Sequence, residues 1–350
     1  MALFGDYHLV SGAGWSVYWR ISKVSGGGLE VWWADYRGRR VLWRGSQPFA
    51  IVPYHRPVIE PPPPEHTYKD GVNPQCGGAP FTALRHTAPN TLQPWMNPGP
   101  YVAAVDTDAV EVSVEPGDDF GPAMLRIVAK FQCGWYQYVH RWEFDSEGTI
   151  HAALGMGGGL NPFAKDKAHV HHMYFRIDLD IDGFGTDVFE VFDHNSFIDP
   201  GGDSWQTMTA QGRFVANPAT ARKFRVRDLT SASQLGALRG YEVELPQNTG
   251  LDQYSTGDVW ATVYRGDHVQ QGDDVGVDCT DKVLGSVYAQ GALDAANGSD
   301  IVLWLAIRHH HEPRFDGEEA EYLPYHYEEF HLTPRGFEVL RVRDQGHDRG

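Results

Sequence analysis

The sequence predicts an all-β protein, a large antiparallel β-sandwich, and two observations carry this prediction. Segments rich in Val, Trp, Tyr and Phe alternate between apolar and polar residues, as in residues 28–35, 109–114 and 175–181. Such alternation is typical of strands with one buried face. The 39 Gly and 22 Pro residues separate many short segments of this kind, which is the pattern of a sandwich. Amphipathic helices are scarce, and only residues 80–85 are expected to form a helical turn or two.

The composition excludes several classes of protein and of partner. Of the 350 residues, 41% are hydrophobic and 13% aromatic, which suits a folded core and not a disordered chain. The net charge of −17 argues against nucleic acid or an anionic membrane surface as a partner. Apolar runs such as residues 301–307 are too short to span a bilayer. We expect a soluble protein with no nucleic-acid partner and no membrane partner.

Three Cys residues are too few for a disulfide framework. The first ten residues lack the basic and then apolar run of a signal peptide, so a cytoplasmic location is expected. Four consecutive prolines within residues 57–66 predict a stiff surface loop and not a domain boundary. We therefore predict a single domain over residues 1–350, with a frayed tail at residues 344–350.

Histidines with metal-ligand spacing form the first candidate site. His169 and His171 are two residues apart in a strand-like segment, so both imidazoles would point to one face. A second group, residues 309–311, follows the apolar segment 301–307. Three imidazoles from two distant strands would form an open site for Cu(II) or Zn(II) with water. The alternative is chance, since the chain contains 17 His.

Several segments together resemble the catalytic domain of the copper-containing amine oxidases. That family carries His-x-His followed by Leu-Asp-x-Asp-x-Asp-Gly, and this chain has His169-Val-His171 and later Leu179-Asp-Ile-Asp182-Gly. Further matching segments are Val41-Leu-Trp-Arg44, Val52-Pro-Tyr54, Asp300-Ile-Val-Leu-Trp304, His311-Glu-Pro-Arg314, Leu323-Pro324 and Pro334-Arg-Gly-Phe337. The resemblance covers about residues 15–337, and the order of the segments makes it more specific than any one motif.

The resemblance implies the fold of that catalytic domain, a homodimer and a mononuclear Cu(II) site. By this resemblance the copper ligands are His169, His171 and His311, and the third ligand is not His309 or His310.

Three further residues acquire roles by the same resemblance. Tyr54 matches the tyrosine that hydrogen-bonds the quinone cofactor, Tyr68 matches the gate position, and Asp70 matches the catalytic base. A carboxylate beside aromatic walls has a raised pKa, which suits proton abstraction. Asp70-Gly71 is also a common turn pair, which is the alternative.

Tyr136 occupies the position of the tyrosine that the family converts to topaquinone, but its neighbours depart from the family motif Thr-x-x-Asn-Tyr-Asp/Glu. Gln132, Trp135 and Gln137 replace the Thr, the Asn and the acid. Two outcomes stay open: Tyr136 is oxidised to the quinone, or it stays unmodified near the metal. A cross-link to Cys133 is not expected, because residues three apart on one strand face opposite ways.

A second, calcium-like site is also implied by the resemblance. Its groups would be Asp178, Asp180 and Asp300, since carboxylate oxygens suit Ca(II). The alternative is that alternating Asp residues only solvate the outer face of a strand.

The predicted function is copper-dependent oxidation of a primary amine by O2, giving an aldehyde, ammonia and hydrogen peroxide. One alternative is a quinone-free copper enzyme with unmodified Tyr136 that acts on another small molecule in specialised metabolism. Others are a non-catalytic copper-binding scaffold and a zinc hydrolase, since three His with an open position also suit zinc.

Overall fold

A computed structural model describes most of the chain. The described ranges are residues 6–22, 28–54, 66–70, 81–86, 101–103, 109–159, 168–194, 204–246, 251, 255–264, 291–311 and 323–337. The proline-rich residues 57–65 and the tail 344–350 lie outside these ranges, so both expectations stay predictions.

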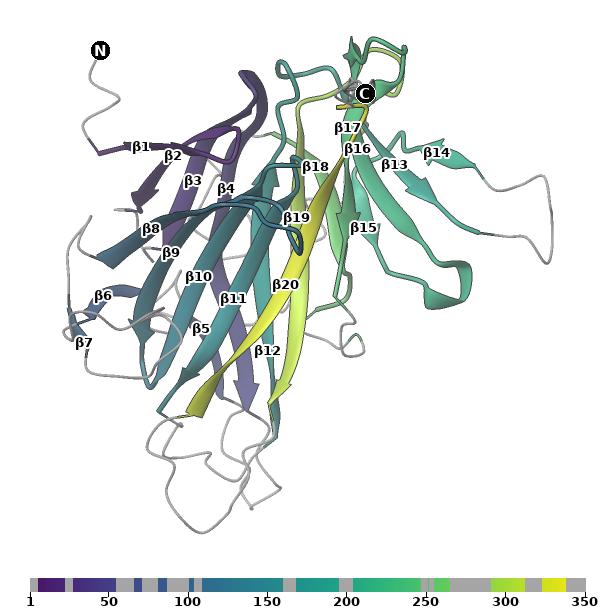
Figure 1. Cartoon of the computed structure of the whole chain (residues 1–350). Helices are drawn as coiled ribbons and strands as arrows, with labels where there is room; N and C mark the ends of the chain where they lie inside the picture. The colour runs from purple at the N-terminus through teal and green to yellow at the C-terminus, as the bar shows by residue number, and fades with distance from the viewer. Residues whose placement is uncertain are drawn as a thin grey trace, which may run out of the picture.

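The described residues form two large antiparallel sheets packed face to face (Figure 1). The nine-stranded sheet has the order β1-β2-β3-β4-β12-β19-β18-β15, with β5 also paired to β4. Its strands are β1 His8–Gly12, β2 Trp15–Ile21, β3 Leu29–Tyr36, β4 Arg39–Tyr54, β5 His66–Asp70, β12 His169–Asp178, β15 Gly212–Phe214, β18 Val259–Val263 and β19 Ile301–His311.

The eleven-stranded sheet has the order β14-β13-β16-β17-β20-β11-β10-β9-β6-β7, with β8 also paired to β9. Its strands are β6 Thr82–His86, β7 Tyr101–Ala103, β8 Val110–Glu115, β9 Met124–Cys133, β10 Tyr136–Asp145, β11 Ile150–Gly158, β13 Asp187–Phe192, β14 Trp205–Thr207, β16 Lys223–Ala232, β17 Leu238–Glu244 and β20 Leu323–Arg335. The one helical element that lies wholly within the described residues is a 3-10 turn at Pro218–Thr220. No helix in these ranges is long and apolar enough to cross a membrane.

The predicted fold class is confirmed, with two local corrections. The helical turn expected at residues 80–85 is wrong, because β6 pairs there with β9 and Thr82 lies opposite Gln132. A short isolated helix is marginal in water, whereas the sheet supplies backbone hydrogen bonds. Strand β8 forms as expected but does not bury one face, because Val112 and Val114 are exposed. Among the described strands, β8 pairs with β9 alone.

The core lies between the sheets and consists mainly of aromatic and branched side chains. Phe175 of β12 packs edge-on against Phe330 of β20, with ring centroids 4.9 Å apart. Trp142 of β10 packs against Gly45 of β4, where a Cβ atom would lie 2.5 Å from the indole ring. Gly45 therefore allows the two sheets to approach closely at this point.

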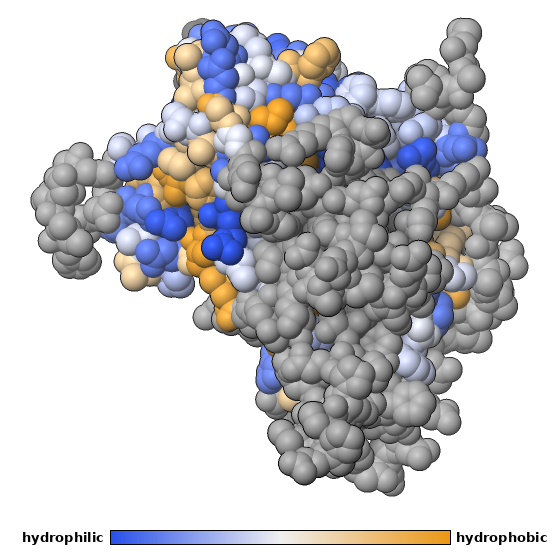
Figure 2. All heavy atoms as spheres, turned by 180° about the vertical axis from the view of Figure 1, so that it is seen from behind, coloured by the Kyte–Doolittle hydropathy of each residue, from blue (hydrophilic) through white to orange (hydrophobic). Residues whose placement is uncertain are grey.

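Among the described residues, few large apolar side chains are exposed. Hydrophilic and hydrophobic residues are interspersed over the coloured part of the face in Figure 2. Ion pairs stabilise charged groups on the outer strands, for example Glu190 of β13 with Arg225 and Arg227 of β16. The arginine side chains of these pairs are partly exposed, so each ion pair contributes only modestly to the free energy of unfolding.

His140 of β10 is a fully buried titratable group in this core. Its ring lies 4.8 Å from that of Phe81 and 4.5 Å from that of Phe131. Its Nδ1 accepts a hydrogen bond from the Leu29 backbone N–H, at 3.3 Å. Burial lowers the pKa of His140 to about 3, so the ring is neutral in the folded chain at neutral pH.

We predict that His140 makes the folded chain sensitive to mild acid. The unfolded His takes up a proton below about pH 6.5, whereas the folded one does not until about pH 3, so stability falls as the pH falls between these values. Between pH 6.5 and pH 5 this group alone should remove about 2 kcal/mol from the free energy of unfolding, measured by urea titration.

The variant His140→Leu should lose this part of the pH dependence. His8→Leu, on the edge strand β1, serves as the control and should behave as the unmodified chain does. An unchanged pH dependence in His140→Leu would contradict the prediction.

Candidate metal centre

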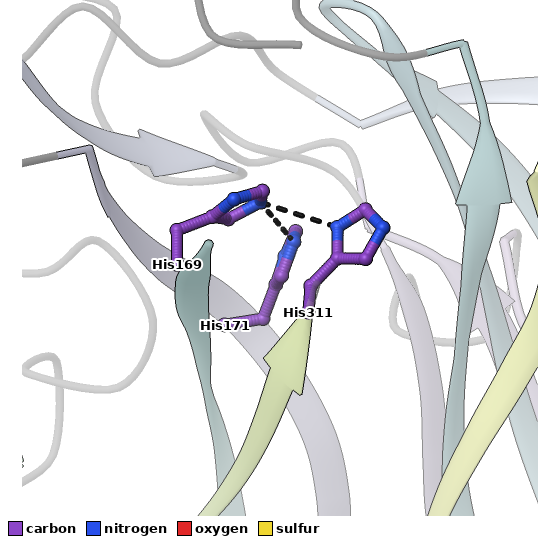
Figure 3. A group of neighbouring side chains, drawn as sticks. All are labelled: His169, His171 and His311. Atoms are coloured by element: carbon purple, nitrogen blue, oxygen red, sulfur yellow. Dashed lines mark hydrogen bonds between the residues drawn. The ribbon is translucent and has the colours of Figure 1, made fainter. Parts of the chain in front are cut away.

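Two neighbouring strands of the nine-stranded sheet position the three predicted histidines. Strand β12 begins at His169 and β19 ends at His311, and the antiparallel register places these two residues directly opposite each other. His171 follows two residues later on β12 and therefore lies on the same face as His169. The structure thus brings His169, His171 and His311 together, as Figure 3 shows.

The ring nitrogens of these histidines converge on one point. The Nε2 atoms of His169 and His171 are 3.0 Å apart, and the Nδ1 atom of His311 lies 3.3 Å from Nε2 of His169 (Figure 3). One ligand atom from each residue lies within 4.8 Å of the others. The side chains are 3%, 0% and 8% exposed, so the cluster is screened from solvent.

The other two residues of the His-His-His segment have different surroundings. Nδ1 of His309 lies 2.7 Å from Oε1 of Glu328 on β20. His310 is exposed. The pairing of His309 with a carboxylate was not apparent from the sequence, because Glu328 belongs to the opposite sheet.

Burial determines the protonation of His171 and His311. It lowers the pKa of His171 well below its usual value, and the neighbouring His169 and His311 lower it further. Burial likewise lowers the pKa of His311 to about 3. A neutral imidazole can offer the lone pair of one ring nitrogen to a metal, and three such nitrogens in close proximity suit a shared transition-metal ion. The residues therefore fit a copper ion.

Tyr136 reaches this cluster from the opposite sheet. It is the first residue of β10 and is 3% exposed. Its hydroxyl lies 3.1 Å from Nε2 of His169, and its ring stands perpendicular to that of His171 with centroids 4.9 Å apart. The structure thus places the predicted precursor tyrosine beside the predicted metal ligands.

The residues that depart from the family motif shape the turn before Tyr136. Gly134 and Trp135 form the two-residue connection between β9 and β10, and Trp135 is partly exposed. The Gln132 amide donates to the carbonyls of Gly134 and Tyr136, at 2.9 and 3.0 Å. Gln137 donates to Oε1 of Gln132 at 3.2 Å and accepts from the Tyr325 hydroxyl. Gln132 and Gln137 therefore stabilise the hairpin on the face away from the Tyr136 ring.

Cys133 and Tyr136 do not face opposite ways, so the reason against a contact between them is wrong. The chain reverses direction between them, and the register pairs Cys133 directly with Tyr136 across the hairpin. Directly paired residues share a face, and both side chains are buried in the main core. The expectation assumed that both residues lie on one strand, whereas they lie on two strands joined by a turn.

The remaining predicted catalytic residues are described only by their backbone. The register pairs Val52 with Tyr68 and Ala50 with Asp70, and Ala50 also pairs with Met173 on β12. Strand β5 is therefore two strands from the strand that carries His169 and His171. The side chains of Tyr54, Tyr68 and Asp70 lie outside the described residues, and their roles stay predictions.

The three aspartates of the predicted second site also lie together. One oxygen from each of Asp178, Asp180 and Asp300 is within 4.8 Å of the others. Asp178 and Asp180 are buried, so the alternative that these residues solvate an outer face is wrong. Burial, with Asp178 and Asp300 nearby, raises the pKa of Asp180 to about 8. In the described part of the chain, Oδ1 of Asp180 and Oδ1 of Asp300 are buried without a hydrogen-bond partner.

Comparison with known proteins identifies the family of this chain. A sequence model of the copper amine oxidase enzyme domain matches residues 124–341, which include Tyr136, His169, His171 and His311. The chain belongs to the copper amine oxidase family.

Solved structures of amine oxidases share the fold. The chain is 17% identical to a copper-containing benzylamine oxidase from Hansenula polymorpha (TM-score 0.64), with 95% of this chain and 61% of that chain covered. It is 16% identical to an amine oxidase from Aspergillus nidulans (TM-score 0.65), with 95% and 53% covered. The chain thus spans between half and two thirds of these relatives. No curated protein sequence matches it significantly.

We predict that the three histidines act as one copper site. Replacing a buried ligand, as in His171→Ala, should weaken copper binding by at least about 100-fold, since even supporting residues around metal ligands contribute 10–100-fold. Copper content after gel filtration and the Cu(II) paramagnetic resonance spectrum measure this. The control is His310→Ala, which removes an exposed neighbouring imidazole and should retain full copper. Full copper retention in His171→Ala would contradict the assignment.

Proposed function

We propose that this family member is a copper-dependent amine oxidase. It would convert a primary amine, dioxygen and water to an aldehyde, ammonia and hydrogen peroxide. The observation that carries the proposal is the Tyr136 hydroxyl, which lies 3.1 Å from Nε2 of His169 within the buried imidazole cluster. A phenol in this position is within reach of an ion held by the three histidines.

The chain's own residues would divide the work as follows. His169, His171 and His311 would hold the copper ion through Nε2, Nε2 and Nδ1. Bound copper supplies one-electron exchange with dioxygen, and a quinone made from Tyr136 would accept the electrons of the amine. By the family resemblance, Asp70 would take the α-proton of the substrate.

The surroundings of Tyr136 would favour this chemistry in two ways. Tyr136 is 3% exposed and the three histidines are buried as well, so bulk water is excluded from the reacting groups. The Gln132 side chain holds the carbonyl of Tyr136 at 3.0 Å and so orients the start of β10. Gln132 was not assigned a role from the sequence, where it appeared only as a departure from the motif.

The position of the Tyr136 hydroxyl also supports a second function, that of a quinone-free copper enzyme. An unmodified Tyr136 could bind copper directly, and the replacements Trp135 and Gln137 support a quinone-free enzyme. Such an enzyme would act on another small molecule. A non-catalytic copper-binding scaffold would also keep this geometry. A homodimer and a cytoplasmic location stay predictions.

A phenylhydrazine titration separates these functions. In copper-loaded, aerated protein we predict a hydrazone absorption band that saturates near one equivalent per chain and is absent in Tyr136→Phe. Release of hydrogen peroxide from benzylamine, a probe suggested by the Hansenula relative, should be lost in the same variant.

Tyr138→Phe is the matched control, since Tyr138 is the next core-facing tyrosine of β10 and is buried. It should keep the band. A featureless titration of protein with bound copper would reject the quinone and favour the quinone-free alternative.

We further propose that Asp178, Asp180 and Asp300 bind Ca(II). Three ionised carboxylates within 4.8 Å repel one another, a repulsion that a bound cation would offset, and hard oxygen donors suit calcium. The buried Arg176 pairs with Oδ2 of Asp178 at 3.2 Å and compensates only part of the negative charge.

Calcium should therefore raise the thermal stability of the chain. At 100 times the dissociation constant the gain should be about 2.7 kcal/mol. Asp180→Asn should lose this gain. Asp182→Asn should keep it, because Asp182 pairs with Arg39 at 2.9 Å instead of joining the cluster. Equal melting temperatures with and without calcium in the unmodified chain would refute the site.

A further inference from the structure

A second histidine cluster lies on the outer face of the eleven-stranded sheet. His151 of β11 and His331 of β20 are paired directly in the antiparallel register, with ring centroids 4.5 Å apart. Glu329 precedes His331 by two residues and shares its face. Their neighbours in sequence, Ala152 and Phe330, point into the core instead.

The potential ligand atoms of this cluster face one another. Nε2 of His331 lies 2.5 Å from Oε1 of Glu329, and Nδ1 of His151 lies 3.6 Å from the same oxygen. One ligand atom from each of the three residues is within 4.8 Å of the others. The side chains of His151, Glu329 and His331 are 18%, 28% and 39% exposed, which leaves one side open to water.

Supporting contacts hold two of the ligands by their other atoms. The Arg141 guanidinium pairs with Oε2 of Glu329 and leaves Oε1 directed at the histidines. Oδ2 of Asp145 lies 3.2 Å from Nε2 of His151, which directs Nδ1 toward Glu329. Asp145 is itself fixed, since its Oδ1 accepts from the backbone N–H groups of Glu147 and Thr149 at 2.8 and 2.9 Å. A carboxylate that orients a histidine in this way is typical of metal sites.

We propose that His151, Glu329 and His331 bind a divalent transition-metal ion, with Asp145 as the residue that positions His151. Two imidazoles and one carboxylate select Zn(II) or a similar ion over Ca(II) or Mg(II). The site is independent of the proposed oxidase function. It lies at the far end of the β10–β11 hairpin from Tyr136. Glu143, which pairs with His151, is seven residues or roughly 23 Å from Tyr136 along β10.

The competing assignment is an ion-pair network without metal, in which a protonated His151 bridges Asp145 and Glu329. Both assignments use the same contacts, but they differ in what a metal ion does to the chain. Zinc binding at this site adds one ion per chain, whereas the ion-pair network takes up none.

The test adds Zn(II) to copper-loaded protein and measures zinc content after gel filtration, with titration calorimetry for affinity. We expect one zinc per chain in addition to any metal in the central cluster. His331→Ala should lose this zinc, and Glu329→Gln, which preserves side-chain volume, should lose it as well. Asp145→Asn should weaken binding by 10–100-fold. His8→Ala, which removes a partly buried imidazole on β1, should leave the zinc content unchanged.

Two results would overturn the proposal. One is the absence of additional zinc in the unmodified chain, which would establish the ion-pair network. The other is equal zinc content in the unmodified chain and in folded Glu329→Gln. Neither result depends on copper or quinone chemistry, because both are measured as zinc content in protein whose central cluster is unchanged.

Discussion

The antiparallel register between β12 and β19 is the constraint on which the central cluster depends. It sets His169 opposite His311, and the two-residue period of β12 adds His171 on the same face. A slip of one residue in this register would turn one strand's imidazoles to the other side of the sheet. The buried partners along the two strands, such as Phe175 opposite Leu305, oppose such a slip because it would expose apolar side chains.

The nine-stranded sheet alone does not complete the site. Tyr136 comes from β10 of the other sheet, so its approach to His169 requires the packing of the two sheets. Contacts such as Trp142 on Gly45 and Phe175 on Phe330 determine the separation between the sheets. Substitutions at these contacts would shift the Tyr136 phenol relative to the imidazoles, although the substituted residues contact neither group. The geometry of the site therefore depends on the packing of the core.

Sequence reasoning succeeded where a short-range period or a motif was sufficient. The spacing of His169 and His171 indicated a shared face, and the family resemblance selected His311 from three adjacent histidines. It failed where contacts between distant residues decide the outcome. Residues 82–86 form a strand because β9 lies beside them, and Cys133 faces Tyr136 because a turn intervenes. The burial of Asp178 and Asp180 likewise depends on the packing around the end of β12.

The two histidine clusters differ in ways that follow from their places in the sheets. The central imidazoles are at most 8% exposed and adjoin a phenol, so an ion there would meet an oxidisable group in a low-dielectric site. The outer imidazoles adjoin carboxylates, with His331 39% exposed, so an ion there would meet negative charge and water. The first environment favours redox chemistry. The second favours a structural role, because an ion held by β11 and β20 would link two neighbouring strands of one sheet.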